Sequence, residues 1–297
     1  MRNSVEVIIN GSSGRITNES TRRIGQLFDE HEVDAAIHVA RDGDALEALA
    51  NQAATSDASI IVAGGGDGTV SAVASAVIGS GKTLGVLPLG TLNNFSRDLG
   101  IPQDLSEAVG LIADNHAAEI DIAEVNGRAF INNSSIGIYP RIVLNRERQQ
   151  RLGKGKWWAA AWAAWRVLRI SPFYRIRLEI DGAEFRRKTP FVFVGNNAYE
   201  MDLYNIGRRL HLNEGELSVY VLHRGGRVGL LLLALRTLFG RLRQAKDFEE
   251  IRTTHLNIEM RRESVLVAVD GEISIMTSPL EYRIRPKALR VIVPDTR

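Results

Sequence analysis

The sequence predicts an α/β protein of two domains: an N-terminal α/β domain with a parallel sheet, and a C-terminal antiparallel β-sandwich domain with helical insertions. Short apolar runs alternate with helical patterns over residues 1–120, which is typical of βαβ units around a parallel sheet. Hairpin signals dominate after that point. The length of 297 residues also exceeds the size at which one hydrophobic core usually stops growing.

The composition is that of an ordinary soluble globular protein. Hydrophobic residues make up 44% of the chain and charged residues 24%, with 37 Lys and Arg against 35 Asp and Glu. These values exclude collagen-like, low-complexity and disordered chains. The absence of Cys excludes disulfides and thiolate metal sites, and it agrees with a cytoplasmic protein. The longest apolar runs, 157–165 and 228–235, end at an Arg well short of the roughly 20 residues that a membrane span needs.

The predicted elements of the first domain alternate between strand and helix. Residues 5–9 form the first strand, and Ile24, Leu27 and Phe28 mark the apolar side of the helix that follows. Asp44, with Glu47 three residues later, predicts the N-cap of the next helix. In chain order the remaining predictions are a strand at 33–39, a helix at 45–54, a strand at 59–63, a helix at 69–78, a strand at 84–87 and a helix at 105–113.

From about residue 119 the pattern changes to antiparallel strands. Residues 119–125 and 128–132 flank Asn126-Gly127, whose residue types suit a two-residue hairpin turn, and Asp181-Gly182 and Asp270-Gly271 predict further turns. We therefore predict a first domain at 1–120, to which 285–297 can return, and a sandwich domain at 121–284. Further strands are predicted at 174–180, 184–194, 217–222, 254–260, 265–269 and 289–293, and helical insertions at 157–170 and 228–242.

The basic residues are concentrated in two segments. Residues 141–175 hold nine Lys or Arg and one Glu, and residues 223–246 hold six and no acid. These segments together carry +14, so the rest of the chain carries −12. Such a split predicts a basic face that attracts phosphates or an anionic membrane surface, rather than a uniformly basic nucleic-acid binder. The alternative is an ordinary solvated helix face.

All four Trp lie in the first basic segment, at positions 157, 158, 162 and 165. Trp158, Trp162 and Trp165 can share one helical face with Lys and Arg around them, which is the pattern of a helix at a membrane interface. Residues 228–242 add a second apolar stripe bordered by Arg. The same pattern fits helices packed on the sandwich or on a second copy of the chain, so a homodimer stays open.

The strongest chemical signal is a glycine cluster between the third strand and a helix. The run Gly64-Gly65-Gly66-Asp67-Gly68-Thr69 lets backbone N–H groups approach phosphate oxygens at the positive end of that helix. It lacks the last glycine of a dinucleotide fingerprint and the Gly-Lys-Ser/Thr of a P-loop. Asp67 would repel phosphate unless it holds Mg²⁺, another cation or a water. The alternative is a structural turn that Asp67 caps.

A second functional run, at residues 88–102, also follows a strand. Its Thr91 and Asn93 are small hydrogen-bonding residues able to reach a sugar or a phosphate. This run, the glycine cluster and the opening run 9–15 resemble the catalytic domain of the diacylglycerol kinase family, in its bacterial lipid kinase branch. The resemblance continues in that family's order through 120–127, 213–217 and 269–272.

The resemblance implies phosphoryl transfer from ATP to a lipid hydroxyl. Glu272 is the implied proton acceptor, and Asp270 stands beside it. The implied contacts of the nucleotide are Asn10, Gly65, Gly66, Asp67, Gly68, Thr69, Thr91 and Asn93.

The resemblance also implies two uses of Mg²⁺. Asp67, Asp98 and Asp121 match acidic positions that organise Mg²⁺ and water near the nucleotide, and Arg15 matches a basic position beside them. The loop that contains His211, Glu214 and Glu216 matches a structural Mg²⁺ loop. Three residues depart from the family pattern: Gly11 replaces a proline, Ala40 a Thr that contacts nucleotide, and Glu214 an Asp.

The sequence therefore predicts an ATP-dependent lipid kinase that phosphorylates a hydroxyl of a diacylglycerol-like or sphingoid lipid. We expect a cytoplasmic protein that associates peripherally with an anionic membrane surface holding its lipid substrate, and that binds no nucleic acid. Two alternatives stay open: an NAD kinase-like phosphotransferase, and a catalytically silent nucleotide- or lipid-binding protein of the same fold. On local sequence alone, Asp270-Gly271 is better explained as a hairpin turn than as part of a catalytic site.

Overall fold

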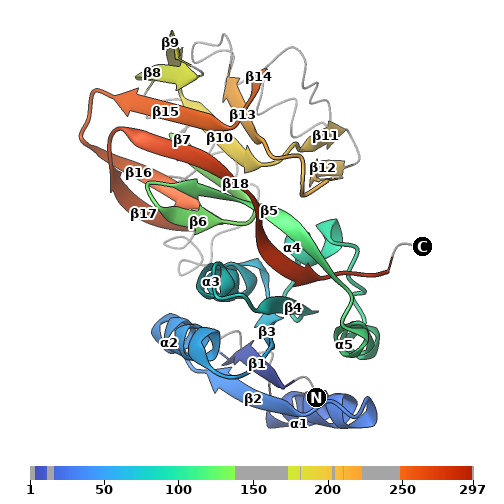
Figure 1. The fold of residues 1–297 in the computed structure, drawn as a ribbon. Helices are drawn as coiled ribbons and strands as arrows, with labels where there is room; N and C mark the ends of the chain where they lie inside the picture. The colour runs from blue at the N-terminus through green and yellow to red at the C-terminus, as the bar shows by residue number, and fades with distance from the viewer. Residues whose placement is uncertain are drawn as a thin grey trace, which may run out of the picture. The chain divides into compact units, whose positions relative to one another are not determined.

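The chain divides into two compact units, each described here by itself (Figure 1). The computed structural model describes residues 4–11, 17–137, 173–180, 182–202, 205–209, 211–222 and 248–295. The first unit comprises Met1–Ile122, His211–Glu214 and Arg285–Arg297, and the second comprises Ala123–Leu210 and Gly215–Ile284. Several predictions lie outside the described residues, namely the helices at 157–170 and 228–242, Arg15, Trp158, Trp162 and Trp165.

The first unit alternates strands and helices around a parallel sheet. The strands pair in the order β2-β1-β3-β4, all in parallel, and the C-terminal end of β18 (Leu280–Ile292) pairs in parallel with β4. This confirms the parallel sheet predicted from the sequence. The other elements are β1 (Val5–Asn10), α1 (Asn18–Glu30), β2 (Ala35–Ala40), α2 (Gly43–Thr55), β3 (Ile60–Gly65), α3 (Asp67–Val77), β4 (Thr83–Pro88), α4 (Asn94–Asp98), α5 (Leu105–Asp114) and β5 (Ala117–Val125), of which β5 continues into the second unit.

Burial on both faces explains why the central strands of this sheet are apolar throughout. Every residue of β3 and β4 is buried, as expected for strands covered on both sides. Helix α3 contributes Val70, Val73, Ala74 and Val77, whose spacing places them on one helical face. Helix α1 buries Ile24, Leu27 and Phe28, the apolar side that the sequence predicted.

Helix α2 begins earlier than the sequence predicted. Its N-cap is Asp42, whose carboxylate accepts a hydrogen bond from the backbone N–H of Ala45 at 2.8 Å. The predicted N-cap, Asp44, lies in the first helical turn instead, so that prediction is wrong. The reason is that Asp42 has the extended backbone that an N-cap needs, whereas the sequence favours Asp44 only because Glu47 follows it three residues later.

The second unit is built from antiparallel strand pairs, in two larger sheets and a two-stranded sheet of β11 and β12. One larger sheet has the order β14-β13-β10-β7-β16-β17. The other contains the N-terminal half of β18 followed by β15, β8 and β9, with the β5–β6 hairpin alongside β18. The new elements are β6 (Arg128–Phe130), β7 (Asn133–Gly137), β8 (Tyr174–Ile180), β9 (Ala183–Thr189), β10 (Phe191–Asn196), β11 (Glu200–Asp202), β12 (Asn205–Arg208), β13 (Leu217–Leu222), β14 (Phe248–Thr253), β15 (His255–Met260), β16 (Ser264–Val269) and β17 (Glu272–Thr277).

Both larger sheets of the second unit contribute to one apolar core, which confirms the predicted β-sandwich. Val192 and Val267 come from one sheet, and Leu256 and Tyr282 come from the other. The Tyr282 ring packs edge-to-face on Phe130 with centroids 6.3 Å apart. Burial raises the pKa of the Tyr282 phenol, whose oxygen lies 3.1 Å from the hydroxyl oxygen of Ser134.

The strand predicted at 184–194 is in fact two strands in different sheets. Strand β9 ends at Thr189 and β10 begins at Phe191, because Pro190 between them has no N–H to donate to a ladder. The Thr189 hydroxyl forms hydrogen bonds with the backbone at this break. It accepts from Phe191 N at 3.2 Å and donates to Phe191 O at 2.8 Å.

Candidate active site

The glycine cluster forms a turn that is tighter than the sequence predicted. Gly64 and Gly65 end β3, Gly66 is the N-cap, and α3 begins at Asp67. A Cβ at Gly65 would lie 2.4 Å from Thr69 Oγ1, and one at Gly90 would lie 2.4 Å from Gly66 Cα. Both glycines are therefore required by packing, since the turn after β3 touches the turn after β4.

Gly68 differs from its neighbours because packing does not require a glycine at this position. A Cβ added at this position meets nothing within 4 Å, and the backbone is helical rather than left-handed. The residue is exposed in the first turn of α3, where backbone N–H groups lack partners inside the helix. The structure thus leaves open space in front of a helix N-terminus, which is where an anion binds.

Asp67 caps the neighbouring helix. Its Oδ1 accepts from Phe95 N at 3.0 Å, and its Oδ2 accepts from Asn94 N at 3.2 Å and Asn94 Nδ2 at 3.3 Å. These hydrogen bonds tie the start of α4 to the start of α3, whereas Asp67 does not cap the glycine turn itself, since α3 has Gly66 as its N-cap without a side-chain hydrogen bond. A carboxylate offers about four acceptor positions, so these bonds leave capacity for a further donor or a cation.

Two other predicted nucleotide contacts lie in hydrogen-bonded positions in the same unit. Asn10 ends β1, the strand beside β3, and its Nδ2 donates to the buried Thr69 Oγ1 at 3.1 Å. Asn93 is buried with a left-handed backbone, and its amide donates to Pro88 O at 3.0 Å and Gly90 O at 3.2 Å. Thr91 is exposed in the same loop. Because the carboxyl ends of parallel strands meet at one edge, β1, β3 and β4 bring these residues to the same side of the sheet.

The predicted acids of the magnesium network do not gather into one cluster. Asp121 is 1% exposed, and its Oδ1 accepts from Lys287 N at 2.9 Å, which ties β5 to β18. Asp98 is half-buried at the end of α4. Within the described parts of the chain, no three His, Asp or Glu side chains form a group able to hold a metal ion.

Residues of the predicted structural magnesium loop also form an ion pair and a hydrogen bond with other parts of the protein. Glu216 Oε1 accepts from Arg252 Nη1 at 2.9 Å, so an arginine balances its charge. His211 and Glu214 are exposed, and Gly215 has φ 72°, a left-handed value that favours glycine. Leu212 O accepts from Asp121 N at 2.7 Å, which anchors this segment in the first unit.

In the second unit, Asp270 and Glu272 flank the tip of the β16–β17 hairpin. Asp270 has φ 49° and Gly271 has φ 90°, so both turn residues adopt the left-handed backbone predicted for an Asp-Gly turn. The Asp270 carboxylate accepts from three backbone N–H groups, those of Ile131 and Asn132 at 2.9 Å and that of Asn133 at 3.0 Å. Asp270 therefore holds the start of β7 in place.

Glu272 is the more accessible of the two acids. Its side chain is 61% exposed, and its Oε2 lies 2.6 Å from Arg128 Nη2 on β6. Arg128 fixes the direction of this carboxylate, a role that the sequence did not predict because the two residues are 144 positions apart. The pair presents an accessible carboxylate with one oxygen bound to a guanidinium.

A buried arginine supports the same segment from the other side. Arg209 is 1% exposed and donates to Ile131 O at 2.5 Å, Asn132 Oδ1 at 2.7 Å and Asn196 O at 3.3 Å. Its guanidinium also lies 5.4 Å from the centre of the Tyr199 ring. Asp270 binds the N–H groups of this segment, and Arg209 binds its Ile131 carbonyl oxygen and its Asn132 side-chain oxygen, so the two side chains together fix the chain that precedes β7.

The sequence matches two known protein families, one in each half of the chain. The model of the diacylglycerol kinase catalytic domain matches residues 4–125, and that of the YegS C-terminal NAD kinase beta sandwich-like domain matches residues 143–293. A Pseudomonas aeruginosa PAO1 protein named "Probable lipid kinase YegS-like" is 30% identical over 284 residues, covering 93% of this chain and 90% of its own. The diacylglycerol kinase of Bacillus subtilis 168 is 26% identical over 298 residues, covering 98% and 96%.

Solved structures show the same fold at greater distance. A crystal structure of a diacylglycerol kinase from Bacillus anthracis Sterne aligns with a TM-score of 0.71 at 20% identity, covering 99% of this chain and 97% of that one. No helix in the described part of this chain is long and apolar enough to cross a membrane.

Proposed function

This chain belongs to the diacylglycerol kinase catalytic-domain family of lipid kinases, and we propose that it transfers the terminal phosphate of ATP to a hydroxyl of a diacylglycerol-like or sphingoid lipid. The observation that carries the proposal is the turn from β3 to α3, where Gly68 leaves open space at a helix N-terminus. The names of the relatives support a lipid as the acceptor.

In this proposal the triphosphate binds to the first backbone N–H groups of α3. The peptide dipoles of the helix favour negative charge there, and Gly68 lets phosphate oxygens come close to the main chain. Asn10 holds the Thr69 hydroxyl, and Asp67 holds the neighbouring loop. The residues predicted as nucleotide contacts thus either meet the phosphates or shape the turn that meets them.

The residues at this turn are compatible with a Mg²⁺ ion that takes few of its ligands from the protein. Mg²⁺ is commonly held by one or two carboxylates together with substrate phosphates, and Asp67 retains acceptor capacity beside the turn. When bound, the ion would neutralise charge on the phosphates. Asp98 and Asp121 stay proposed members of the surrounding water network.

Glu272 is proposed to take the proton of the lipid hydroxyl. As the hydroxyl oxygen forms a bond to the terminal phosphorus, the bond from that phosphorus to the bridging oxygen breaks and ADP leaves. The hydroxyl proton moves to a Glu272 carboxylate oxygen. The ion pair with Arg128 keeps one oxygen of Glu272 fixed while the other stays available. Asp270 acts by holding the segment before β7 rather than by touching the proton.

One observation favours an alternative, an NAD kinase-like activity: residues 143–293 match a family model described as an NAD kinase beta sandwich-like domain.

One assay distinguishes the lipid kinase activity from the NAD kinase-like activity. Purified protein is incubated with Mg²⁺ and ATP labelled in the terminal phosphate, together with diacylglycerol or sphingosine in mixed micelles, or with NAD. We expect label in the lipid. Label in NAD alone would replace the lipid proposal, and label in neither acceptor would favour a silent binding protein.

Replacing Gly68 by Val should weaken ATP binding by roughly tenfold or more, which corresponds to about 1.4 kcal/mol. A Cβ added at Gly68 meets nothing within 4 Å, so the side chain is expected to obstruct a ligand that approaches the turn. Isothermal titration with ATP and Mg²⁺ measures the effect. Gly43→Val is the matched control, because Gly43 also lies in the first turn of a helix with nothing within 4 Å. Equal affinities in the two variants would mean that phosphate does not bind at Gly68.

A further inference from the structure

The outer face of the β8–β9 hairpin places like charges directly opposite one another. Arg175 pairs with Lys188, and Arg177 pairs with Arg186, in the strand register. Because side chains alternate along a strand, these four cations share one face, and the buried Ile176 and Leu178 lie on the other. Like charges directly opposite in an antiparallel pair are destabilising. Folding of the hairpin therefore gives no reason for this arrangement.

Neighbouring acids balance only part of this charge. Arg177 lies 3.2 Å from Glu259 and 3.5 Å from Glu184. Arg187 is on the opposite face and makes two hydrogen bonds to Glu249, at 2.8 and 2.9 Å. Across the residues that the structure describes, no ion pair involves Arg175, Arg186, Lys188 or Arg261.

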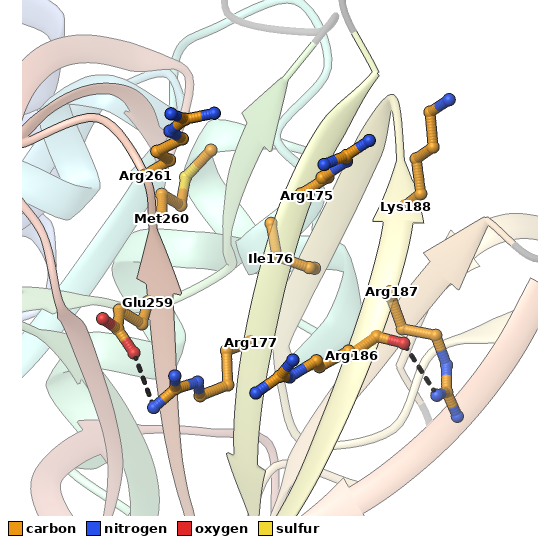
Figure 2. A pocket seen from close by; sticks show the side chains of 9 residues that line it. All are labelled: Arg175, Ile176, Arg177, Arg186, Arg187, Lys188, Glu259, Met260 and Arg261. Carbon is orange, nitrogen blue, oxygen red and sulfur yellow. Dashed lines mark hydrogen bonds and ion pairs between the residues drawn. The ribbon is translucent and has the colours of Figure 1, made fainter.

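These cations surround an open hollow on the sheet surface. Its volume is about 520 Å³, and its lining contains one acid, Glu259, with the cations Arg175, Arg177, Arg186, Lys188 and Arg261. Figure 2 shows the Arg177 and Arg186 side chains running across the sheet toward β15, while Arg187 turns away on the other side. A second hollow of about 370 Å³ continues from Arg175 and Arg261 to Arg262, beside the aromatic rings of Phe173 and Tyr174.

We propose that this basic face, consisting of Arg175, Arg177, Arg186, Lys188 and Arg261, docks the protein on the anionic phosphate headgroups of a lipid bilayer. The cations are spread over β8, β9 and the residue that follows β15, so they match several phosphates in a plane better than one small anion. Guanidinium groups bind phosphate in a bidentate manner. Aromatic rings beside basic residues are typical of membrane interfaces, and Phe173 lies 5.8 Å from the Lys188 ammonium.

The docking inference rests on the proposed function, because a lipid kinase meets its acceptor at a bilayer. It places a basic surface in the described part of the second unit, and Arg175 is the last residue of the Trp-containing basic segment 141–175. The five cations neutralise headgroup charge, and the bilayer in turn relieves the repulsion between the cross-strand pairs. Binding should therefore depend on anionic lipid and weaken as salt shortens the Debye length.

The test is co-sedimentation of the full chain with vesicles of phosphatidylcholine alone or with 30% phosphatidylglycerol. Wild-type protein should bind only the anionic vesicles. Arg186→Gln/Lys188→Gln should reduce partitioning on the order of 30-fold, because each basic residue near such a surface contributes about a fivefold factor. The control, Arg22→Gln/Arg290→Gln, removes the same charge from exposed positions of the first unit and should bind like wild type.

Three results would overturn the docking surface. These are unchanged vesicle binding in the Arg186→Gln/Lys188→Gln variant, equal losses in both double variants, and wild-type binding to a DNA duplex without binding to anionic vesicles. Melting supplies a folding check: the Arg186→Gln/Lys188→Gln variant should melt no lower than wild type, since it removes two like-charge pairs. A lower melting temperature would contradict the premise that these charges oppose folding.

Activity on a monomeric short-chain diacylglycerol separates this inference from the proposed function. Without vesicles, the Arg186→Gln/Lys188→Gln variant should turn over this substrate as wild type does. If wild-type protein phosphorylates no lipid at all, the kinase proposal fails while the vesicle measurement still decides the docking surface. A variant that loses turnover of the monomeric substrate would show that the face acts in catalysis instead of docking.

Discussion

Replacing Glu272 by Gln is expected to lower lipid phosphorylation by a factor on the order of 100 or more while ATP binding persists. Gln keeps the length of the side chain and its contact with Arg128 but cannot accept the proton. The Glu272–Arg128 pair is exposed, and such pairs contribute about 0–1 kcal/mol to stability. A hundredfold loss of turnover could therefore not be explained by unfolding. Steady-state turnover, ATP titration and a melting curve measure the three quantities.

Two companion variants sharpen this test. Glu263→Gln removes an exposed acid elsewhere in the same unit and should leave turnover unchanged. Arg128→Gln leaves the Glu272 carboxylate in place, so its effect should be much smaller than that of Glu272→Gln. Equal losses in Arg128→Gln and Glu272→Gln would mean that the ion pair matters rather than the base. Full activity in Glu272→Gln would move the base to another residue.

Replacing Arg209 by Met is expected to lower the free energy of unfolding by about 3–5 kcal/mol. The substitution removes this donor from Asn132 Oδ1 and Asn196 O, and it leaves Ile131 O with the Asn196 Nδ2 donor at 3.1 Å. Each buried acceptor that loses its partner costs about 1–3 kcal/mol. Arg209→Lys should recover part of the loss, because one ammonium retains the charge but cannot reproduce the guanidinium fork. Equilibrium denaturation by urea measures the change.

The matched control is Arg252→Met, which removes an arginine that is 53% exposed and paired with Glu216 and Glu250. Its cost should stay below about 1 kcal/mol. Similar losses in the two variants would contradict the supporting role assigned to Arg209. An Arg209→Met protein of normal stability would likewise show that the chain before β7 does not depend on this side chain.

The parallel sheet could be predicted from sequence because its signal is local. Strands β3 and β4 are short apolar runs, and α3 follows with apolar residues at helical spacing. Strand β17 was missed because it is an edge strand in which no residue is buried and Ile275 is 72% exposed, so burial imposes no clear alternation on its sequence. The break at Pro190 was missed because residues that favour strands lie on both sides of it, Thr189 before it and Phe191 and Val192 after it.

The candidate site likewise combines local turns, which the sequence predicts, with long-range contacts, which it does not. The glycine turn and the Asp270-Gly271 turn are local features, and both adopt the expected structures. What the sequence could not show is which side chains hold these turns. Asp67 binds the start of α4, and Asp270 binds the chain before β7, through partners 27 to 28 and 137 to 139 residues away. Arg128 and Arg209 belong to no motif, so only the folded structure identifies them.

The central claim is that the turn from β3 to α3 binds the triphosphate of ATP. The most direct measurement is a crystal structure of the full chain with Mg²⁺ and a non-hydrolysable ATP analogue. The account predicts phosphate oxygens within about 3.2 Å of the backbone nitrogens of Gly68 and Thr69. A triphosphate bound elsewhere, with no phosphate contact to the first turn of α3, would contradict it.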